Sequence, residues 1–390
     1  MVGQQIHLAT RQGRIAASTD RNDCPARRFK TEVIVTITKE ILEIPAALRQ
    51  MCEEGRPLYD ALVRRASWGE RPIFVVAGAS AHPAGLTAAW AFESLLGMPA
   101  VVQRPDHFSA YTSRALATRS LVIIMEAAGA QEETLASARK AKAHGAMVWA
   151  VTPDPAGELA RLADATVNDY AGGPAADSAR SIFCRHAAMV FLAVAAAKIL
   201  KAPSASLRGQ EEELEKLAQE AEWVLTRIPD AALALAREAT ALQALYVTGG
   251  GAFYPVALQA AERLARTAGT AIRGMDLPDF QQVLPGISQP GSGVLYLSSS
   301  RCGLKTQVHR SAHKARLNGR LKVLAITDRN DRQLSERADM AVLLPILTEA
   351  GAALLALLLL EIAAGDAVRA SRTAAQPARA KKTRNRTGST

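Results

Sequence analysis

The chain repeats one short pattern of apolar and polar positions at two places. From Pro72, the run PIFVVAGASAHPAGLTAAWAFESLLG reads as an apolar β-rich segment, a turn of small residues and a helix-forming stretch. Near Leu245, the run ALYVTGGGAFYPVALQAAERLART has the same order, and Gly78 and Gly249 in the two turns stand 171 residues apart. Each run predicts a strand, a glycine turn and a helix.

A second pair of segments matches at almost the same spacing. The run SLVIIMEAAGAQEETLASARKAKAHGAMVWAVT aligns with GVLYLSSSRCGLKTQVHRSAHKARLNGRLKVLAIT with a single one-residue gap. Beyond it, an offset of 175 relates four pairs of identical residues, namely Thr152 and Thr327, Leu159 and Leu334, Ala163 and Ala338, and Asp164 and Asp339. Two matches with nearly equal offsets indicate an internal duplication. Because strands alternate with helices, we expect two tandem, doubly wound α/β domains, each with a parallel sheet.

The predicted domain limits follow from this repeat. Between the two copies lies a polar, Glu-rich stretch of amphipathic helix that Pro229 should interrupt. We therefore predict a polar extension over residues 1–33, a first domain over 34–203, a helical linker over 204–240, a second domain over 241–375 and a basic tail over 376–390.

Charge is concentrated at the two ends. The 390 residues carry a formal charge of +10, of which residues 1–31 supply +4 and residues 367–390 supply +7, so the body is near −1. These ends are rich in Ser, Thr, Ala and Arg and cannot build a core, so we interpret them as solvated tails. The alternative is an arm that binds nucleic acid. No zinc finger or aromatic RNA-binding signature accompanies them, and we do not expect a nucleic-acid partner.

Other compositional signals favour an intracellular protein without a membrane span. The four cysteines are far apart and form no C-x-x-C pair, which fits a reducing cytoplasm. The N-terminus lacks the apolar segment of a signal peptide, and the apolar run over 350–360 is too short to span a bilayer, so we expect a buried helix there. No Walker loop, G-x-G-x-x-G fingerprint or metal motif appears, since His309 and His313 lack a third ligand. We expect neither a cofactor nor a metal.

Several runs together resemble the tandem SIS (sugar isomerase) domains that form the isomerase half of glucosamine-6-phosphate synthase and occur in related deaminases and deglycases. They are KEILEIPAALRQ, VAGASAHPAGLTAAWAFESLLGMPA, SLVIIMEAAGAQEETLASARKAKAHGA and NDYAGGPAADSARSIFCRHAAM. The resemblance covers residues 34–375. It implies flavodoxin-like domains, a small-molecule sugar derivative as ligand, and a homodimer.

The phosphate loop of the family departs from its pattern here. The family places Ser and Thr hydroxyls at a helix start, where backbone N–H groups and the helix dipole favour an anion. This chain has instead Glu126, Ala127, Ala128, Gly129, Ala130 and Gln131. Because a carboxylate repels a nearby phosphate by several kcal/mol, we do not expect phosphate to bind there in the family's way. We expect Glu126, Ala128, Gly129 and Gln131 to contact a different ligand.

Three other segments supply candidate binding residues. Gly78, Ala79 and Ser80 form the first glycine loop, with a plain strand-to-helix turn as the alternative. Arg180 is a candidate for pairing with an anion. The alternative is that this segment is only a helix start, capped by Asp177 or Ser178. In the second copy, one loop aligns with residues 126–131, the segment that lacks the family's hydroxyls. This loop offers hydroxyls and cations, among them Ser300, Arg301 and Lys305. An ordinary solvated turn is the alternative.

The catalytic groups of the family are also altered. Family isomerases need a base, usually a Glu on a second-domain helix, which falls on Arg266 here. A guanidinium cannot act as a base near neutral pH. Glu262, one turn earlier, and Asp279, in the segment where the family has a histidine, are the candidates that remain. Two hypotheses follow: an isomerase, deaminase or deglycase with a non-standard site, or a non-catalytic carbohydrate-derivative binder.

Overall fold

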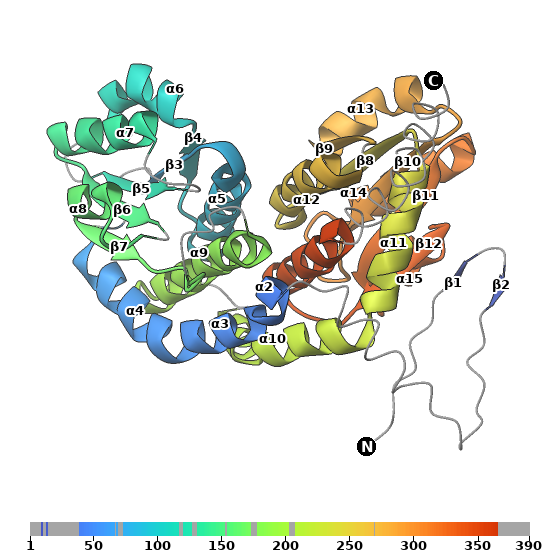
Figure 1. Ribbon diagram of the computed structural model, residues 1–390, viewed down its shortest axis with the longest axis horizontal. Helices are drawn as coiled ribbons and strands as arrows, with labels where there is room; N and C mark the ends of the chain where they lie inside the picture. Colours follow the sequence, from blue (N-terminus) through green and yellow to red (C-terminus); the bar gives the residue numbers. More distant parts are fainter. Residues whose placement is uncertain are drawn as a thin grey trace, which may run out of the picture. The chain divides into compact units, whose positions relative to one another are not determined.

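The chain forms two compact α/β units. The computed structural model describes residues 9–10, 13–14, 39–66, 68, 73–116, 120–126, 131–152, 154–172, 178–202, 207–268 and 270–365. The amino-terminal unit comprises Leu42–Glu222 and Leu347–Leu354, and the carboxy-terminal unit comprises Trp223–Ile346 with the described parts of 1–41 and 355–390. Each unit is built around its own sheet (Figure 1).

The amino-terminal unit has a five-stranded parallel sheet in the order β4-β3-β5-β6-β7. Its strands are β3 Ile73–Ala77, β4 Ala100–Gln103, β5 Leu121–Met125, β6 Met147–Val151 and β7 Ala165–Val167. Every residue of β3 and β5 is buried. Such unbroken apolar runs are typical of parallel strands covered on both faces, and they are the signal that predicted these strands.

Helices cover both faces of this sheet (Figure 1). One apolar cluster joins Phe74 and Val122 of the strands to Phe108, Leu135 and Leu159 of α6, α7 and α8. On α5, which packs on α9, Gly85 lies close to β3, where an added Cβ would be 3.1 Å from that of Ala77. The helical elements from Lys39 to Arg227 are α2 Lys39–Leu42, α3 Ile44–Gln50, the π-helix η1 Met51–Gly55, α4 Arg56–Arg65, the 3₁₀ helix η2 Ala79–Ala81, α5 His82–Leu96, α6 Pro105–Ala110, the 3₁₀ helix η3 Thr112–Ala115, α7 Glu132–Ala143, α8 Glu158–Leu162, α9 Ala179–Ile199 and α10 Leu207–Arg227, of which α2 and α10 each cross the limit between the two units.

The carboxy-terminal unit repeats the same topology. Its parallel strands run in the order β9-β8-β10-β11-β12, and two short antiparallel strands extend the sheet beyond β12. The strands are β8 Ala244–Gly249, β9 Ala271–Asp276, β10 Ser292–Leu297, β11 Lys322–Asp328, β12 Met340–Leu344, and the added β1 Ala9–Thr10 and β2 Gly13–Arg14. In both units the first strand lies between the second and the third, which is the flavodoxin-like order. The predicted fold class is confirmed.

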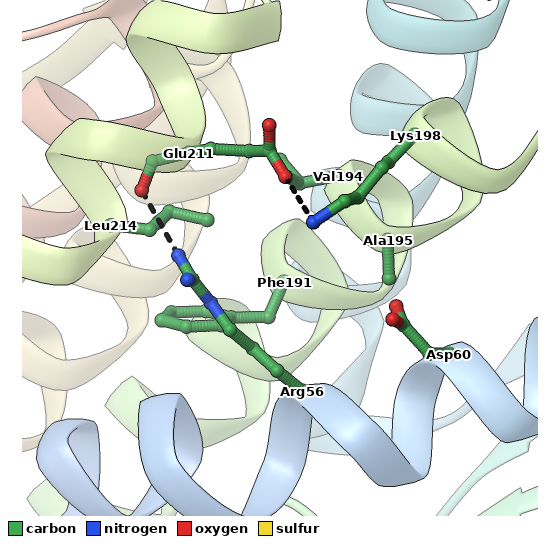
Figure 2. A pocket seen from close by; sticks show the side chains of 8 residues that line it. All are labelled: Arg56, Asp60, Phe191, Val194, Ala195, Lys198, Glu211 and Leu214. Atoms are coloured by element: carbon green, nitrogen blue, oxygen red, sulfur yellow. Dashed lines mark hydrogen bonds and ion pairs between the residues drawn. The ribbon is translucent and has the colours of Figure 1, made fainter. Parts of the chain in front are cut away.

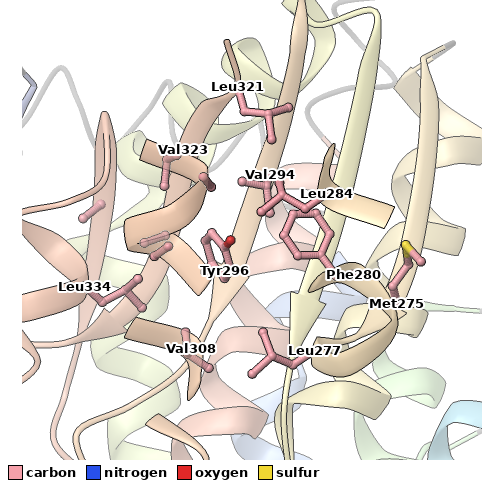
Figure 3. Packing of buried hydrophobic residues seen from close by; sticks show 14 residues of the cluster. Met275, Leu277, Phe280, Leu284, Val294, Tyr296, Val308, Leu321, Val323 and Leu334 are labelled. Carbon is pink, nitrogen blue, oxygen red and sulfur yellow. The ribbon is translucent and has the colours of Figure 1, made fainter. Parts of the chain in front are cut away.

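A dense apolar layer holds the helices onto this second sheet. Figure 3 shows Phe280 beside Tyr296 of β10. The centroids of the two rings are 5.8 Å apart, and the rings meet edge to face. The helices after α10 are α11 Pro229–Ala241, α12 Phe253–Ala268, α13 Leu277–Ile287, α14 Lys305–Asn318, α15 Arg332–Ser335 and a further helix over 349–365, whose first part belongs to the amino-terminal unit. That last helix is buried over 350–364, which confirms the prediction for 350–360.

Two aspartates show how closely the units correspond. Asp164 donates its N–H to Val148 O and accepts the Val148 N–H at Oδ2. Asp339 makes the same pair of bonds with Val323, 175 residues later. Each aspartate therefore closes the turn that leads into the last parallel strand of its unit. That the units arose by duplication stays a prediction.

The segment between the two sheets is helical, as expected. α10 and α11 meet at Ile228 and Pro229, which confirms the predicted break. The two compact units divide inside α10, between Glu222 and Trp223. The predicted limits at 203 and 240 stay predictions. Of the described helices, α9 is long and apolar enough to cross a membrane, yet 89% of its most apolar window is buried, as in the core helix of a globular protein.

Candidate functional site

The carboxyl edge of the amino-terminal sheet brings two predicted loops together. The strand order changes direction between β3 and β5, and ligands of such sheets bind outside the carboxyl ends of the strands at that switch point. Ala77 and Met125 are the last paired residues of these two strands. Gly78 and Glu126 follow them directly. The structure therefore places the loop after β3 and the start of the loop after β5 side by side.

The loop after β3 is a tight turn. The Ala81 N–H donates to Gly78 O at 3.0 Å, and η2 leads directly into α5. A Cβ on Gly78 would lie 3.2 Å from the ring of Pro105, so glycine permits the β4–α6 connection to approach. Ser80 is buried at 3% exposure, and Ala79 is the first residue of η2. Both interpretations of this loop, a turn and a binding loop, are compatible with this geometry.

Glu126 is a buried carboxyl group at the end of β5. It is 5% exposed, and its Oε2 accepts a hydrogen bond from Thr152 Oγ1 at 2.7 Å. Its N–H donates to Val151 O at 2.9 Å, so the residue is held at both backbone and side chain. A buried carboxyl group without a donor would be costly. Thr152, at the end of β6, supplies that donor.

The rest of the loop after β5 is only partly described. Ala128 and Gly129 lie outside the described residues. Gln131 is exposed and caps α7 through its backbone, since Gln131 O accepts the Thr134 N–H at 2.9 Å. Gln131 therefore stands at the start of a 12-residue helix, where the resemblance placed the end of the phosphate loop.

The same edge carries a histidine that the sequence analysis missed. His82 begins α5, is half-buried, and holds Nδ1 3.3 Å from Ala77 O. A carbonyl oxygen only accepts hydrogen bonds, so Nδ1 carries the proton and Nε2 keeps its lone pair. Burial, followed by the positive charge of Arg104, lowers the pKa of His82 below its usual 6.5. The imidazole is therefore a neutral proton acceptor near neutral pH.

A small cavity elsewhere in the amino-terminal unit is no substrate site. Figure 2 shows Arg56 and Lys198 both reaching Glu211. Arg56 donates to the backbone oxygen of Glu211 at 3.0 Å, and Lys198 is paired with its carboxylate, also at 3.0 Å. The cavity has a volume of about 30 Å³. That is room for one or two water molecules.

Comparison with known proteins identifies the fold that carries this edge. Residues 68–198 match the SIS domain. This range contains the loops after β3 and β5, His82 and Thr152. Residues 68–198 are a SIS domain.

Proteins similar to this chain include glutamine–fructose-6-phosphate aminotransferases (isomerizing). The one from Thermococcus kodakarensis is 25% identical over 313 residues, which cover 80% of this chain and 51% of the relative. The one from Mycolicibacterium smegmatis is 31% identical over 199 residues, covering 50% of this chain and 31% of the relative. The chain thus spans about half the length of the first relative and about a third of the length of the second. The resemblance to SIS proteins is confirmed.

Solved structures show the same fold. The C-terminal domain of glucosamine-fructose-6-phosphate aminotransferase from Francisella tularensis superposes with a TM-score of 0.74 at 16% identity, covering 90% of this chain and 97% of that one. Glucosamine-6-phosphate deaminase from Thermotoga maritima has a TM-score of 0.64 at 15% identity, covering 85% and 95%. At these identities the likeness concerns the fold.

Arg180, near the end of the SIS domain, is already engaged within the unit. Its guanidinium donates to Glu43 Oε2 at 2.6 Å and also to Gly172 O. Ser178 caps α9 by accepting the Ser181 N–H at 3.1 Å, as one interpretation of this segment expected. Binding of a ligand by Arg180 would require displacement of the Glu43 carboxylate.

The two catalytic candidates lie in different places within the carboxy-terminal unit. Asp279 is in the first turn of α13, at the carboxyl end of β9, and its N–H donates to Asp276 Oδ1 at 2.8 Å. Glu262 is nine residues into α12, about 13 Å along a helix that begins at the same edge. Its carboxylate is paired with Arg266. The structure does not bring Glu262 to the carboxyl edge of this unit.

The Ser-rich loop after β10 already holds a carboxylate. Ser300 donates its N–H and its hydroxyl to Asp328 Oδ2, at 2.6 and 2.9 Å. Lys305 donates to Ser300 O at 2.8 Å, and Arg301 is exposed. Ser300 and Lys305 are therefore neighbours, and part of the hydrogen-bonding capacity predicted for an anion is used by Asp328.

Proposed function

We propose that this protein binds a sugar derivative at the carboxyl edge of the amino-terminal sheet and acts on it as an isomerase, deaminase or deglycase with a non-standard site. The SIS domain and the relatives support a small-molecule sugar derivative as the ligand. The altered loop after β5 supports a substrate other than the family's usual phosphate ester.

The observation that carries the proposal is the buried Glu126 carboxyl group held by Thr152. Two unit charges 4 Å apart interact by about 4 kcal/mol at an effective dielectric constant of about 20, so the sign of the ligand's charge matters greatly here. An ammonium group on the sugar would be attracted, whereas a phosphate would be repelled. We therefore infer an amine-bearing or unphosphorylated sugar as the ligand.

His82 supplies the proton chemistry that this proposal needs. Moving a proton between adjacent sugar carbons requires a base within reach of the substrate. The lowered pKa and the lone pair on Nε2 suit His82 to that task. In this proposal Glu126 binds the amine and His82 accepts the proton from C2.

A non-catalytic binder is the second candidate, and one observation favours it. Arg266 stands where the resemblance expects the base, and it is ion-paired with Glu262. Neither side chain of that pair is available as a free base. In this second candidate function, the protein binds a ligand but catalyses no reaction on it.

Proton exchange separates the two candidates. The purified protein is incubated in D₂O with glucosamine, fructosamine and their 6-phosphates, and loss of the C2 or C1 proton signal is followed by NMR. The proposal predicts exchange with the unphosphorylated amines, abolished in His82→Asn and retained in His144→Asn, whose histidine is exposed at the end of α7. Binding without exchange on every sugar would establish the pure binder instead.

The resemblance also leads us to propose a cytoplasmic homodimer. Sedimentation equilibrium across a range of concentrations tests the dimer. A mass equal to the chain's 41.5 kDa at all concentrations would contradict it.

A further inference from the structure

An open, largely apolar pocket lies between the edge strand β9 and the helix α13 of the carboxy-terminal unit. Its volume is about 290 Å³, close to the lower limit of roughly 300 Å³ for ligand pockets. Of the eight described residues that line it, seven have apolar or aromatic side chains and the eighth is Arg273. A lining that is apolar apart from a single charge is typical of a site for a small organic ligand.

The hollow exists because two small residues begin the neighbouring strands β8 and β9. Ala244 and Ala271 are Cα partners in the parallel ladder. Tyr246 and Arg273 form the next pair on the same face. Because the alanine side chains end at Cβ, they leave space beside the larger pair. Both strands begin at these alanines, so the pocket reaches the amino edge of the sheet, opposite to the carboxyl edge at which ligands of such sheets bind.

Helix α13 and the rest of β9 supply the apolar walls. Val283 and Ile287 lie one turn apart on α13 and therefore share a face of that helix. Met275 lies two residues beyond Arg273 on β9, and Ile272 completes the lining. Val283 is 38% exposed. A large apolar side chain exposed in a pocket wall offers surface that a ligand can remove from water.

Arg273 is the charged group of this pocket. The residue is exposed, and its side chain makes no hydrogen bond or ion pair with any residue that the structure describes. Asp276, the acidic residue of the same strand, is about 10 Å away along the strand and accepts the Asp279 N–H at 2.8 Å. A guanidinium stays charged at neutral pH. No residue that lines the pocket compensates this positive charge.

We propose that this pocket binds a small monocarboxylate with an apolar tail, such as a medium-chain fatty acid. The carboxylate pairs with Arg273, whose planar guanidinium matches its geometry and can donate two parallel hydrogen bonds. The tail lies against α13 and the two alanines. A phosphate dianion fits poorly, because apolar walls offer none of the donors that it needs on leaving water. The site shares no residue with the carboxyl edge of the amino-terminal sheet, so the inference goes beyond the proposed function.

Calorimetric titration of the full chain with acetate, butanoate, hexanoate and octanoate at low ionic strength tests this site. Each methylene group that leaves water strengthens binding by about fourfold, so the affinity should rise along the series until the pocket is full. Octanol, which has a similar tail without the charge, should bind about tenfold more weakly than octanoate. Equal affinities along the series would overturn the inference, because the general attraction of an anion to a cation does not depend on its tail.

Two variants remove the charge and the space separately. Arg273→Gln should weaken octanoate about tenfold and leave octanol unchanged, because only the charged donor is lost. Ala271→Leu should abolish binding of both, because the larger side chain occupies the hollow. Ala271 is exposed, so the fold should tolerate this change.

Arg320→Gln is the matched control for the charge. Arg320 is an exposed cation of the same unit and does not line the pocket, so its loss should leave both affinities unchanged. An equal loss of octanoate affinity in Arg320→Gln and Arg273→Gln would overturn the assignment of Arg273.

A second copy of the chain is the other occupant that this face could accept. Sedimentation equilibrium of the wild type and of Ala271→Leu distinguishes it from a carboxylate. A wild-type dimer that dissociates in Ala271→Leu, together with no binding of any of the acids, would overturn the inference, because a second copy would then cover the pocket. None of these results bears on proton exchange at the amino-terminal edge, so the two proposals fail separately.

Discussion

Replacing Thr152 by valine removes the hydroxyl that supports Glu126 while keeping the shape of the side chain. Thr152 is 4% exposed, and its Oγ1 donates to Glu126 Oε2 at 2.7 Å and accepts the Asp154 N–H at 3.1 Å. A hydrogen bond to a charged group contributes about 1.5–3 kcal/mol when its loss leaves the partner buried. We therefore expect Thr152→Val to reduce the free energy of unfolding of the amino-terminal unit by about 2–3 kcal/mol.

Urea unfolding measures this loss. Three of the four tryptophans, Trp68, Trp90 and Trp149, lie in the amino-terminal unit, so fluorescence reports mainly its unfolding. With a urea slope of about 2 kcal/mol per molar, the midpoint should fall by roughly 1 M at unchanged slope. A second variant, Thr152→Ser, keeps the hydroxyl and should recover most of the loss.

Thr248→Val is the matched control. Thr248 is fully buried at the end of β8, and its Oγ1 has no hydrogen-bond partner in the part of the chain that the structure describes. Replacing an unsatisfied hydroxyl by a methyl group should be neutral or slightly stabilising, which circular dichroism can follow. An unchanged midpoint in Thr152→Val, or an equal loss in Thr248→Val, would refute the view that Thr152 specifically supports a buried carboxyl group.

Two further predictions concern the pH dependence of stability. Burial, followed by the charge of Arg104, lowers the pKa of His82 below its usual 6.5. The unfolded chain therefore takes up the proton first, and stability should fall as the pH drops below this usual value. His82→Asn should flatten that part of the profile. Burial raises the pKa of Glu361 to about 7 from the usual 4.5, against the nearby charge of Arg263, so stability should fall as the pH rises through this interval. Glu361→Gln should remove that fall. Urea midpoints across the pH range check both, and profiles parallel to the wild type would contradict the respective assignment.

The fold follows from local signals in the sequence, with one exception. Buried parallel strands such as β3 are short apolar runs next to glycine turns, and the repeated residues Asp164 and Asp339 close equivalent turns. The exception is the added ladder of β1 and β2, in which Thr10 pairs with Met340. Two-residue strands pair through backbone groups, so a side-chain pattern carries no signal for them.

The candidate site was only partly predictable. Gly78 and Glu126 are found because each directly follows an apolar strand, and parallel strands end at one edge. His82 was missed because a single histidine at the start of a helix has no periodic signature, and its lowered pKa depends on burial and on Arg104. Arg180 left two interpretations open, since its partner Glu43 lies 137 residues away in the chain.

The central claim is that Glu126 has changed the ligand preference of a SIS domain from phosphate to amine, and one measurement tests it most directly. Affinities for glucosamine and for glucose 6-phosphate are measured on the wild type, on Glu126→Ser and on Glu133→Ser, which removes an exposed carboxylate from the adjacent α7. We predict that Glu126→Ser weakens glucosamine about tenfold or more and strengthens glucose 6-phosphate, whereas Glu133→Ser changes neither. Unchanged affinities for both ligands in Glu126→Ser would contradict the claim.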